Sequence, residues 1–334
     1  MAEIRIAVVG AGVAGMSCAA ELARTDARVT VFERSRGLGG RLATRRERGA
    51  TFDHGAQFVT ARSRPFSKFM ETAARAGVAA PWRPRLSEDT RIWDAPIEDW
   101  YVGVPGMSAL VRPLGRYVQL LSGTSVHELF SRDGGWELVT DAGRHKELFD
   151  AIAIAIPAPQ ALTLLAPYSR AFRHLTDVVF APCWSAMLAF ADPLPVPAEA
   201  MRWTSGPLAW AASHAGRPGR TSSPHSWVLH ASAEWSRAHL ELDARDAAQS
   251  LYEAFAAVLD LTLPVPQIQL AHRWRYAQVE RALGLPCLVD QESGAGTCGD
   301  WCIAPRVEAA FESGRALAHS LLSVVGLQAP LTRR

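Results

Sequence analysis

The chain has 334 residues, of which 49% are hydrophobic, and its formal net charge is +2. This length and composition allow two domains, each with a sizeable core. Charges of the two signs nearly balance and form no long run, which argues against a nucleic-acid-binding protein. Five cysteines without paired spacing argue against a disulfide framework and a zinc site, so we predict a cytoplasmic protein without a metal.

Residues 4–33 have the pattern of a strand, a glycine turn, a helix and a second strand. The glycines follow G-x-G-x-x-G in the setting that dinucleotide binding requires, because they allow a tight turn, close approach of a pyrophosphate and close helix packing. The uncharged stretch 6–20 lacks a basic leader, which favours this unit over a membrane segment. We predict a dinucleotide site at Gly10, Ala11, Gly12, Val13, Ala14 and Gly15, with Glu33 bonding the ribose of an adenosine.

Two short segments follow that are rich in glycine or aromatic residues. Residues 34–41 have three glycines in four positions and flanking arginines, which suits a pyrophosphate, although a solvated basic loop is the alternative. Residues 51–58 are centred on a glycine and flanked by aromatic residues. The apolar spacing then predicts a helix over 63–76, ended by Gly77, and another over about 108–121.

An Asp133-Gly134 turn and a second turn at 141–143 separate three runs, which predict strands at 125–130, 136–140 and 151–156. The last run is apolar throughout, as in a strand buried on both faces. Residues 159–269 differ in composition and predict a second, largely β domain with strands at 185–191, 208–213 and 227–232 and a helix at 244–259. The segment 271–277 follows, and then a strand that ends in a Gly-Asp pair and a helix at about 306–325 repeat the pattern of the N-terminal segment.

Taken together, these features resemble the FAD-dependent amine-oxidase-like flavoproteins, and more closely the renalase family. The closer resemblance depends on Asp53-His54-Gly55-Ala56-Gln57-Phe58, on His272-Arg273-Trp274-Arg275-Tyr276 and on Gly299-Asp300. It implies an α/β fold with a Rossmann-like FAD-binding domain (1–78, 101–160 and 270–330) that contains a β-meander. It also implies a second α+β substrate domain (79–100 and 161–269) on a mostly antiparallel sheet.

The resemblance implies non-covalent FAD. Phosphate and flavin contacts would come from Arg34, Gly39, Gly40 and Arg41, with Ala56, Gln57 and Phe58 beside the isoalloxazine. Further contacts would come from Val126, from Gly299 and Asp300 at the ribityl chain, and from the helix that starts near Val307.

Renalases resemble oxidases of misformed dihydronicotinamides, the 2- and 6-dihydro isomers of NAD(P). Such an enzyme passes a hydride to FAD and returns NAD(P)⁺, and O₂ then yields hydrogen peroxide. In this sequence the residues expected in catalysis are Trp274, His230 and Arg273, and Trp274 would stack on the nicotinamide. Those expected in substrate binding are His230, Trp274, His272, Trp203 and Trp210.

The lysine content bears on the reaction. Amine oxidases of this fold commonly place a lysine over the flavin, whereas the only lysines here are Lys68 and Lys146, in segments that do not suit that place. A dihydropyridine needs no base to give up its hydride, so the sequence favours a dihydronicotinamide oxidase. The alternatives are an amine oxidase or desaturase, a redox-quiet FAD-containing binding protein, and an NAD-binding protein without flavin.

Overall fold

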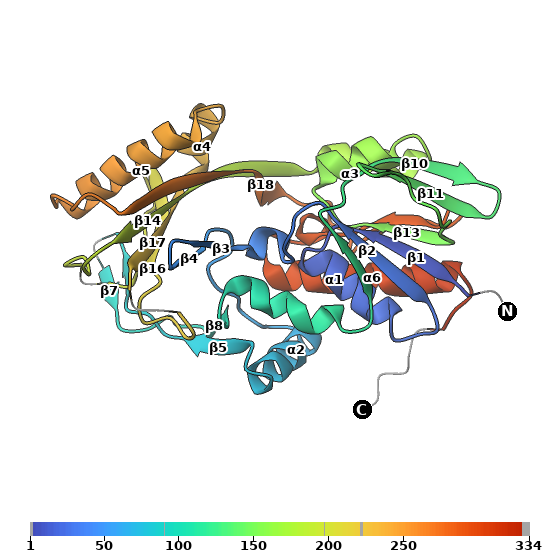
Figure 1. Cartoon of the computed structure of the whole chain (residues 1–334), viewed down its shortest axis with the longest axis horizontal. Helices are drawn as coiled ribbons and strands as arrows, with labels where there is room; N and C mark the ends of the chain where they lie inside the picture. Colours follow the sequence, from blue (N-terminus) through green and yellow to red (C-terminus); the bar gives the residue numbers. More distant parts are fainter. Residues whose placement is uncertain (1–2, 90, 197, 221–222, 329–334) are drawn as a thin grey trace. The chain divides into compact units, whose positions relative to one another are not determined.

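The computed structural model describes residues 3–89, 91–196, 198–220 and 223–328. The described residues divide into two compact units (Figure 1). The first unit takes its residues from the ranges 1–40, 111–179 and 279–334, and the second from 41–110 and 180–278. No helix within the described ranges is long and apolar enough to span a membrane.

The first unit contains a mostly parallel sheet, which we call the first sheet, with the strand order β19-β20-β13-β1-β2-β9. Its strands are β1 (Arg5–Val9), β2 (Arg28–Glu33), β9 (Gln119–Ser122), β13 (Ala151–Ile154), β19 (Leu288–Asp290) and β20 (Ala295–Thr297). Only β19 runs antiparallel to its neighbour. Every residue of β13 is 0% exposed, which confirms the prediction of a strand buried on both faces.

Helices α1 (Val13–Leu22) and α6 (Val307–Val324) pack against each other in the first unit (Figure 1). They approach closely at Gly314, where an added Cβ would lie 2.0 Å from the carbonyl oxygen of Ala14. A separate antiparallel sheet contains the first two strands of the predicted β-meander, but its third strand is β12 (Gly143–Arg144), since the run predicted at 151–156 is β13 of the first sheet. The unit also contains short helices. These elements are β10 (Val126–Arg132), β11 (Gly135–Thr140), β12 (Gly143–Arg144), α3 (Ala158–Leu165), η3 (Arg170–Asp177) and η4 (Asp300–Cys302).

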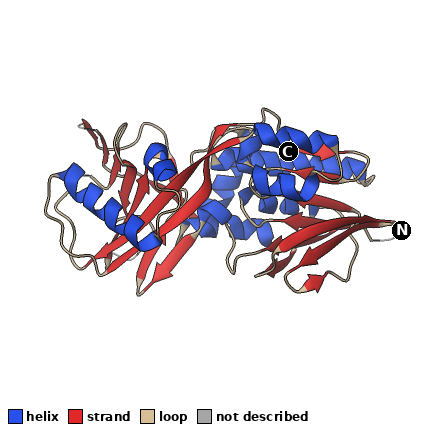
Figure 2. Cartoon of the chain, turned by 90° about the horizontal axis from the view of Figure 1, so that it is seen from above, coloured by secondary structure: helices blue, strands red, loops and turns tan. Residues whose placement is uncertain are grey.

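The second unit is built on a mostly antiparallel sheet, the second sheet, with the order β18-β14-β17-β16-β15-β6-β7. Its strands are β6 (Leu86–Glu88), β7 (Arg91–Trp93), β14 (Val179–Phe190), β15 (Ala200–Arg202), β16 (Leu208–Ser213), β17 (His225–Ala231) and β18 (Ile268–Arg281). Helix α5 (Ala244–Leu259) lies against one face of this sheet (Figure 2), and α4 (Ala233–Ala238) precedes it.

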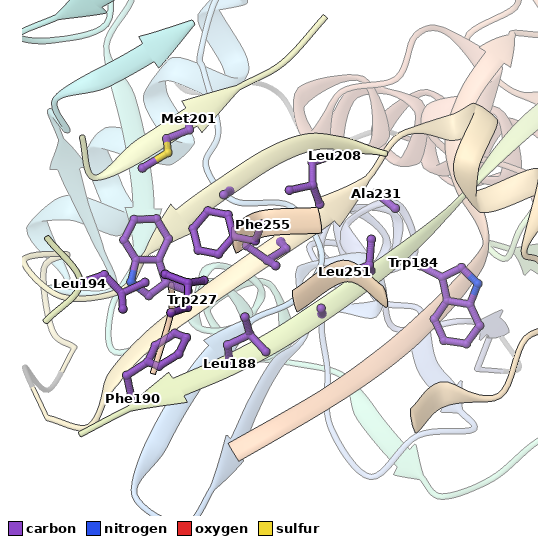
Figure 3. Close-up of a cluster of buried hydrophobic side chains, with 14 of the residues drawn as sticks. Trp184, Leu188, Phe190, Leu194, Met201, Leu208, Trp227, Ala231, Leu251 and Phe255 are labelled. Atoms are coloured by element: carbon purple, nitrogen blue, oxygen red, sulfur yellow. The ribbon is translucent and has the colours of Figure 1, made fainter. Parts of the chain in front are cut away.

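The face of the second sheet under α5 carries an apolar core. Phe255 and Leu251 of α5 meet Trp227, Leu188 and Phe190 of the strands (Figure 3). On the opposite face, Ala50 and Phe52 pack against Met187, Ala189, Val228 and Ile268. Because side chains alternate along a strand, each strand contributes to both faces. The remaining elements of this region are η1 (Gly40–Leu42), β3 (Thr44–Glu47), β4 (Ala50–Asp53), α2 (Arg64–Arg75), β5 (Ala79–Trp82), β8 (Trp100–Gly103) and η2 (Met107–Gly115).

The fold class agrees with the prediction, but three details differ. Residues 41–78, 101–110 and 270–278, expected in the FAD-binding domain, belong to the second unit, because β4 packs on the second sheet and β18 is one of its strands. Residues 161–179, expected in the substrate domain, belong to the first unit. The predicted helix over 108–121 is the 3₁₀ helix η2 followed by β9, since Pro113 lacks the N–H that an α-helix needs there.

Candidate functional site

The predicted cofactor residues of the first unit gather at one edge of the first sheet. The Gly10–Gly15 turn follows β1, Glu33 ends β2, and Gly299-Asp300 follows β20. These strands run parallel through β13, so their carboxyl ends meet at the same edge. Ligands of open α/β sheets bind in the crevice outside the carboxyl ends of the strands.

The glycine turn has the shape that a pyrophosphate requires. Gly10 has a φ of +103°, and a Cβ on Gly15 would lie 1.9 Å from the carbonyl oxygen of Gly10, so both positions need glycine to fold. A Cβ on Gly12, in contrast, would meet nothing within 4 Å. Gly12 is also the N-cap of α1 and supplies no side-chain hydrogen bond there. The open space above Gly12, at a helix N-terminus, fits a bound phosphate group.

The loop after β2 contacts the Gly10–Gly15 turn through Gly39 and Gly40. Gly39 N–H donates to the carbonyl oxygen of Ala11 at 2.9 Å, and Gly40 has a φ of +53°, with the position of its missing Cβ 3.3 Å from the Gly12 Cα. Arg34, in the same loop, is exposed. Thr124 N–H donates to the Glu33 carbonyl oxygen at 2.8 Å, which brings the segment leading to Val126 beside the end of β2. The structure thus gathers the residues predicted for the adenosine and phosphate end.

Glu33 binds two backbone groups of this edge. Its Oε2 accepts from the N–H of Ala11 at 2.8 Å, and its Oε1 accepts from the N–H of Ser35 at 2.7 Å. The residue is only 7% exposed. The carboxylate therefore links the glycine turn to the following loop. Each oxygen has a second lone pair that a ribose hydroxyl could use.

Replacing Glu33 with alanine is expected to weaken FAD binding at least tenfold and to lower the free energy of unfolding by about 1–3 kcal/mol, because two N–H groups lose their acceptor. FAD titration and urea unfolding of the apoprotein measure the two effects. Glu98→Ala is the control, since Glu98 pairs with Arg62 at 2.8 Å with half of each side chain exposed. Unchanged FAD affinity in Glu33→Ala would show that Glu33 has no part in the site.

Gly299 and Asp300 connect β20 to α6. Gly299 N–H donates to the Oγ of Ser313 at 3.0 Å, and a Cβ on Gly299 would overlap the Trp301 ring, so this position leaves no room for a side chain. Asp300 is 7% exposed and opens η4. Helix α6 begins at Val307, and its N-cap Arg306 provides no side-chain hydrogen bond. Gly299-Asp300 and the start of α6 are the two features that the sequence assigns to contacts with a polar cofactor.

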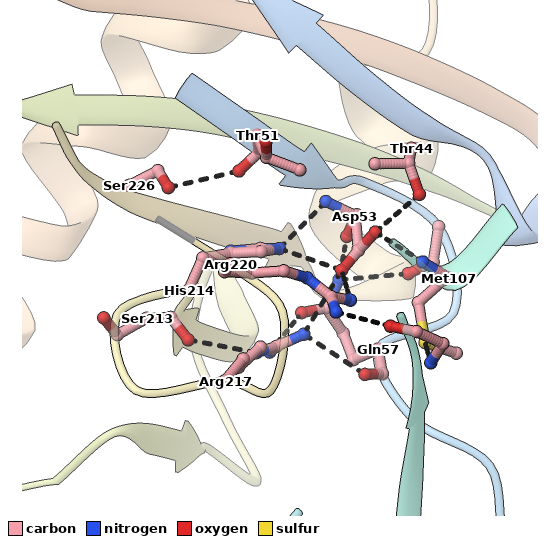
Figure 4. A network of polar contacts seen from close by, with 12 residues as sticks. Thr44, Thr51, Asp53, Gln57, Met107, Ser213, His214, Arg217, Arg220 and Ser226 are labelled. Atoms are coloured by element: carbon pink, nitrogen blue, oxygen red, sulfur yellow. Dashed lines mark hydrogen bonds and ion pairs between the residues drawn. The ribbon is translucent and has the colours of Figure 1, made fainter. Parts of the chain in front are cut away.

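The second unit contains a buried polar network around Asp53 (Figure 4). Asp53 Oδ1 accepts from Thr44 Oγ1 at 2.7 Å and from Met107 N–H at 2.9 Å, and Oδ2 accepts from Arg220. His214 Nε2 accepts from the Asp53 N–H at 2.9 Å. Burial alone would raise the pKa of Asp53. Its contact with His214 and the charges of Arg220 and Arg217 outweigh burial and hold that pKa well below its usual value of 3.8.

Arg217 ties this network to Gln57. It donates to the Gln57 carbonyl oxygen at 3.2 Å and to the Gln57 Oε1 at 2.9 Å, and its guanidinium lies 4.0 Å from the centre of the Trp82 ring. The Gln57 Nε2 in turn donates to the carbonyl oxygens of Asp53 and Gly55. The amide of Gln57 is therefore used to hold the 53–58 segment together, and any contact with a flavin would come from its backbone or its methylene groups.

Three histidines and a tryptophan cluster on the face of the second sheet away from α5. Trp274 stacks on His54 at 5.3 Å and donates from Nε1 to the His54 carbonyl oxygen at 2.9 Å. His272 lies edge-on to both rings, at 4.3 Å from Trp274 and 5.0 Å from His54. Burial lowers the pKa of His54 and of His230 to about 4, so both rings are neutral near pH 7.

Arg273 and Trp203, which the sequence predicts in the site, lie on the face of the second sheet that α5 covers. Arg273 and Arg275 alternate with His272 and Trp274 along β18, and both pair with Glu241 at 2.8 Å. Trp203 packs against the apolar core under α5, with its ring 6.5 Å from that of Phe255. Because successive side chains of a strand point to opposite faces, Arg273 and Trp274 lie on opposite faces of the sheet. The structure therefore does not bring Arg273 or Trp203 to the histidine cluster.

Phe58 and Trp210, two further aromatic residues that the sequence predicts in the site, lie together in the second unit. Phe58 stacks on Trp100 at 3.7 Å with 11° between the rings, and Trp210 lies 5.8 Å from Phe58. In the same unit Arg41 donates to the Ala277 carbonyl oxygen and its own carbonyl oxygen accepts from Ala56 N–H. Sequence reasoning missed Trp100 as a partner of Phe58, and also Arg217, Arg220 and His214, because these residues come from distant segments without a motif.

Both lysines are exposed. Lys68 lies on the outer face of α2, and Lys146 lies between β12 and β13. Among the described residues, no group of histidine, cysteine, aspartate and glutamate side chains is arranged to hold a metal ion. The cysteines are unpaired, and burial raises the pKa of the Cys302 thiol to about 12.

Comparison with known proteins gives a short match in sequence. Residues 8–73 match the family described as an NAD(P)-binding Rossmann-like domain. The 4,4'-diapophytoene desaturase of Staphylococcus haemolyticus is 48% identical over 54 residues, which cover 16% of this chain and 11% of that enzyme. The corresponding enzyme of Staphylococcus aureus strain Newman is 43% identical over 56 residues. The chain thus matches about a tenth of the length of these curated relatives.

Solved structures match nearly the whole chain. A predicted protoporphyrinogen oxidase from Exiguobacterium sp. 255-15 has a TM-score of 0.75 and 15% identity, over 96% of this chain and 99% of that one. An oxidoreductase from Methanosarcina mazei has a TM-score of 0.70 and 13% identity, over 94% and 99%. Putrescine oxidase bound to putrescine has a TM-score of 0.67 and 12% identity, over 96% and 99%.

At these identities the likeness establishes the fold. With the Rossmann-like match and the phosphate-shaped glycine turn, it supports FAD as the cofactor. The fold of this chain is that of the FAD/NAD(P)-binding, amine-oxidase-like oxidoreductases.

Proposed function

We propose that this protein is a renalase-like flavin oxidase that takes a hydride from the 2- and 6-dihydro isomers of NAD(P), returns NAD(P)⁺ and, with O₂, gives hydrogen peroxide. The observation that carries the proposal is the cluster of His54, His230, His272 and Trp274 on one face of the second sheet, in which burial lowers the pKa of His54 and of His230 to about 4. It offers aromatic surface and hydrogen bonds. The exposed positions of Lys68 and Lys146 do not suggest a catalytic lysine.

The chemistry of a dihydropyridine suits such a cluster. Loss of a hydride leaves an aromatic pyridinium, so no proton has to be removed from carbon and the protein mainly binds and orients the ring. Bound FAD supplies the two-electron acceptor. The first-unit edge from Gly10 to Gly15, with Glu33 and Asp300, would hold it. In the second unit, Trp274 is fixed by His54, which pre-sets the orientation of its indole ring.

The expected result is fast anaerobic flavin reduction by the 2- and 6-dihydro isomers, with little pH dependence between about pH 6 and 9, because a required base would leave a titration limb. His54 and His230, with a pKa of about 4, do not titrate in this window. Stopped-flow reduction of the holoenzyme by 2-, 4- and 6-dihydro-NAD(P), primary amines and catecholamines is the test.

Variants sharpen this test. Trp274→Ala should slow reduction through lost alignment, whereas Lys68→Ala and Lys146→Ala are matched controls that should leave it unchanged. The proposal is contradicted if the rate of flavin reduction in the wild type rises steeply with pH, as it does when a base must be deprotonated, or if either lysine variant loses reduction.

An amine oxidase or desaturase is the second candidate. It is favoured by the likeness of the fold to putrescine oxidase and by the short identity with diapophytoene desaturases. Those likenesses concern the fold and the N-terminal segment, which different reactions share. Reduction by amines, and none by any dihydronicotinamide, would select this candidate.

A further inference from the structure

The second unit contains a cavity of about 600 Å³ at the end of the second sheet where β16 ends and β17 begins. Leu194, Ala198 and Trp227 form its apolar wall, and all three belong to the core under α5 (Figure 3). Ser213, the register partner of Trp227, also lines it. The volume is within the range of roughly 300–1,000 Å³ that is typical of sites for small molecules.

The cavity is separate from the histidine cluster. Trp227 and His230 are three residues apart on β17, so their side chains point to opposite faces of the sheet. Trp227 lies on the face under α5, and His230 lies on the face that carries the cluster. No member of the cluster is among the described residues that line the cavity. A ligand bound here would therefore be additional to the substrate and to FAD.

Glu199 is held at the wall of the cavity. Its Oε2 accepts from the N–H of Arg85 at 3.0 Å, its N–H donates to the Arg85 carbonyl oxygen at 2.9 Å, and its carbonyl oxygen accepts from Ser213 N–H at 2.8 Å. A Cβ on Gly216, which also lines the cavity, would lie 2.9 Å from the Glu199 Oε1. Glycine at this position leaves Oε1 uncovered. Within the described part of the chain, this oxygen accepts no hydrogen bond.

Charges of both signs surround this carboxylate. Arg83, Arg85 and Asp94 also line the cavity and are exposed, so two positive and two negative side chains are present besides His225. Arg83 pairs with Asp99 at 3.3 Å, but these side chains are 71% and 64% exposed. Exposed pairs of this kind are weak, which leaves the Arg83 guanidinium able to turn towards a ligand.

The indole N–H of Trp227 is a buried donor at the same wall. Trp227 is only 3% exposed, and its nitrogen lies at the Leu194 end of the core (Figure 3). Among the residues that the structure describes, none accepts a hydrogen bond from it. An indole N–H can only donate, so it requires an acceptor on the ligand. The cavity thus combines an uncovered anionic acceptor, a free donor, a cation and an apolar wall.

A zwitterion with an apolar side chain complements this set. An ammonium group supplies three donors, and a carboxylate supplies only acceptors. We propose that the cavity binds an apolar α-amino acid, with its ammonium group on Glu199 Oε1, its carboxylate on Trp227 Nε1 and Arg83, and its side chain on Leu194 and Ala198. A ligand with one charge would satisfy only one part of the set. This inference is independent of the proposed function.

Three probes with the same phenyl group test this inference. L-Phenylalanine has both charges, 2-phenylethylamine lacks the carboxylate, and 3-phenylpropanoate lacks the ammonium group. Each is titrated into the holoprotein, and binding is measured by calorimetry. L-Phenylalanine is expected to bind at least about tenfold more tightly than either analogue, because each analogue lacks one set of charge-assisted hydrogen bonds.

Glu199→Gln tests the ammonium contact. A glutamine oxygen still accepts from the N–H of Arg85, so the fold is kept while the negative charge is removed. Affinity for L-phenylalanine and for 2-phenylethylamine should fall about tenfold, and affinity for 3-phenylpropanoate should not fall. Glu253→Gln is the matched control, because Glu253 is an exposed residue of α5 that does not line the cavity. Its three affinities should equal those of the wild type.

Arg83→Gln tests the carboxylate contact. It should weaken L-phenylalanine and 3-phenylpropanoate several-fold and leave 2-phenylethylamine unchanged, because only the first two probes carry a carboxylate. Arg62→Gln is the control, since Arg62 forms a similar exposed pair with Glu98 and does not line the cavity. Near-ultraviolet circular dichroism of each variant checks that the fold is kept.

The outcomes are decisive in both directions. The inference is overturned if L-phenylalanine binds no more tightly than its analogues, or if Glu199→Gln and Glu253→Gln behave alike. It is also overturned if a dihydronicotinamide displaces L-phenylalanine, because the two ligands would then share the flavin site. If no dihydronicotinamide reduces the flavin, the proposed function falls, whereas the calorimetric comparison still decides whether the cavity binds an amino acid.

Discussion

Replacing Arg220 with leucine is expected to lower the free energy of unfolding by about 3–5 kcal/mol, because it leaves the charge of Asp53 buried beside fewer partners. Asp53 and Arg220 have side chains that are 0% and 1% exposed, and Arg220 donates directly to the Asp53 Oδ2. Arg217 stands further off, at 3.8 Å from the same oxygen. It cannot take the place of Arg220 without giving up its bonds to Gln57.

Urea unfolding at a fixed excess of FAD measures this effect. Arg62→Leu is the matched control, because Arg62 pairs with Glu98 at 2.8 Å but both side chains are about half exposed. Exposed pairs of this kind contribute roughly 0–1 kcal/mol. Equal losses in the two variants would show that the Asp53 network does not stabilise the second unit.

The same network predicts a dependence on pH. The pKa of Asp53 in the folded protein lies well below its usual value of 3.8, so the ionised carboxylate favours folding above that value. Its contribution is lost as the pH falls from about 4 downwards, because the unfolded chain then takes up the proton first. Asp53→Asn should therefore be less stable than wild type at neutral pH, and its stability should fall less steeply below pH 4.

Replacing Gly12 with alanine is expected to abolish most FAD binding, by about a hundredfold or more, while the apoprotein keeps its stability. A Cβ at this position meets nothing within 4 Å of the protein, and its φ of −73° suits alanine. In the bound state the methyl group would occupy the space that a pyrophosphate needs. A hundredfold loss corresponds to about 2.7 kcal/mol of binding free energy.

Gly15→Ala is the informative contrast. Its Cβ would lie 1.9 Å from the carbonyl oxygen of Gly10, so this variant is expected to lose the fold of the first unit as well as the cofactor. Thermal unfolding of the apoproteins and the amount of FAD released by heat distinguish the two cases. If Gly12→Ala binds FAD as wild type does, the phosphate does not lie on this turn. Flavin that stays with the precipitate would contradict non-covalent binding.

The segment 4–33 is the part of the structure that the sequence determined most completely. The glycine spacing, the strand and helix patterns and Glu33 lie within one short segment, so local chemistry and local geometry specify them together. The helix over 244–259 was predicted for the same reason and is α5, residue for residue. Its apolar period and the capping Asp243 are both readable in the sequence.

Other features depended on contacts between distant segments. The helix expected over 108–121 gives way to η2 and β9, because residues 119–122 pair with β2. That strand pairing competes with the local helical period, and Pro113 weakens the helix further. Residues 41–78 join the second unit because β4 finds apolar partners on the second sheet, which the sequence pattern alone does not name.

The candidate site divides in the same way. The motif around Trp274 marked a functional segment, but only the tertiary structure showed that it is part of β18 and which face of its sheet α5 covers. That choice turned Arg273 towards Glu241 and Trp274 towards His54. Likewise, Asp53 could be read as part of a motif, whereas its partners His214, Arg217 and Arg220 lie far along the chain. The sequence specifies which helices and strands form locally, while long-range burial and strand pairing decide which face of each element is covered and which face can carry the site.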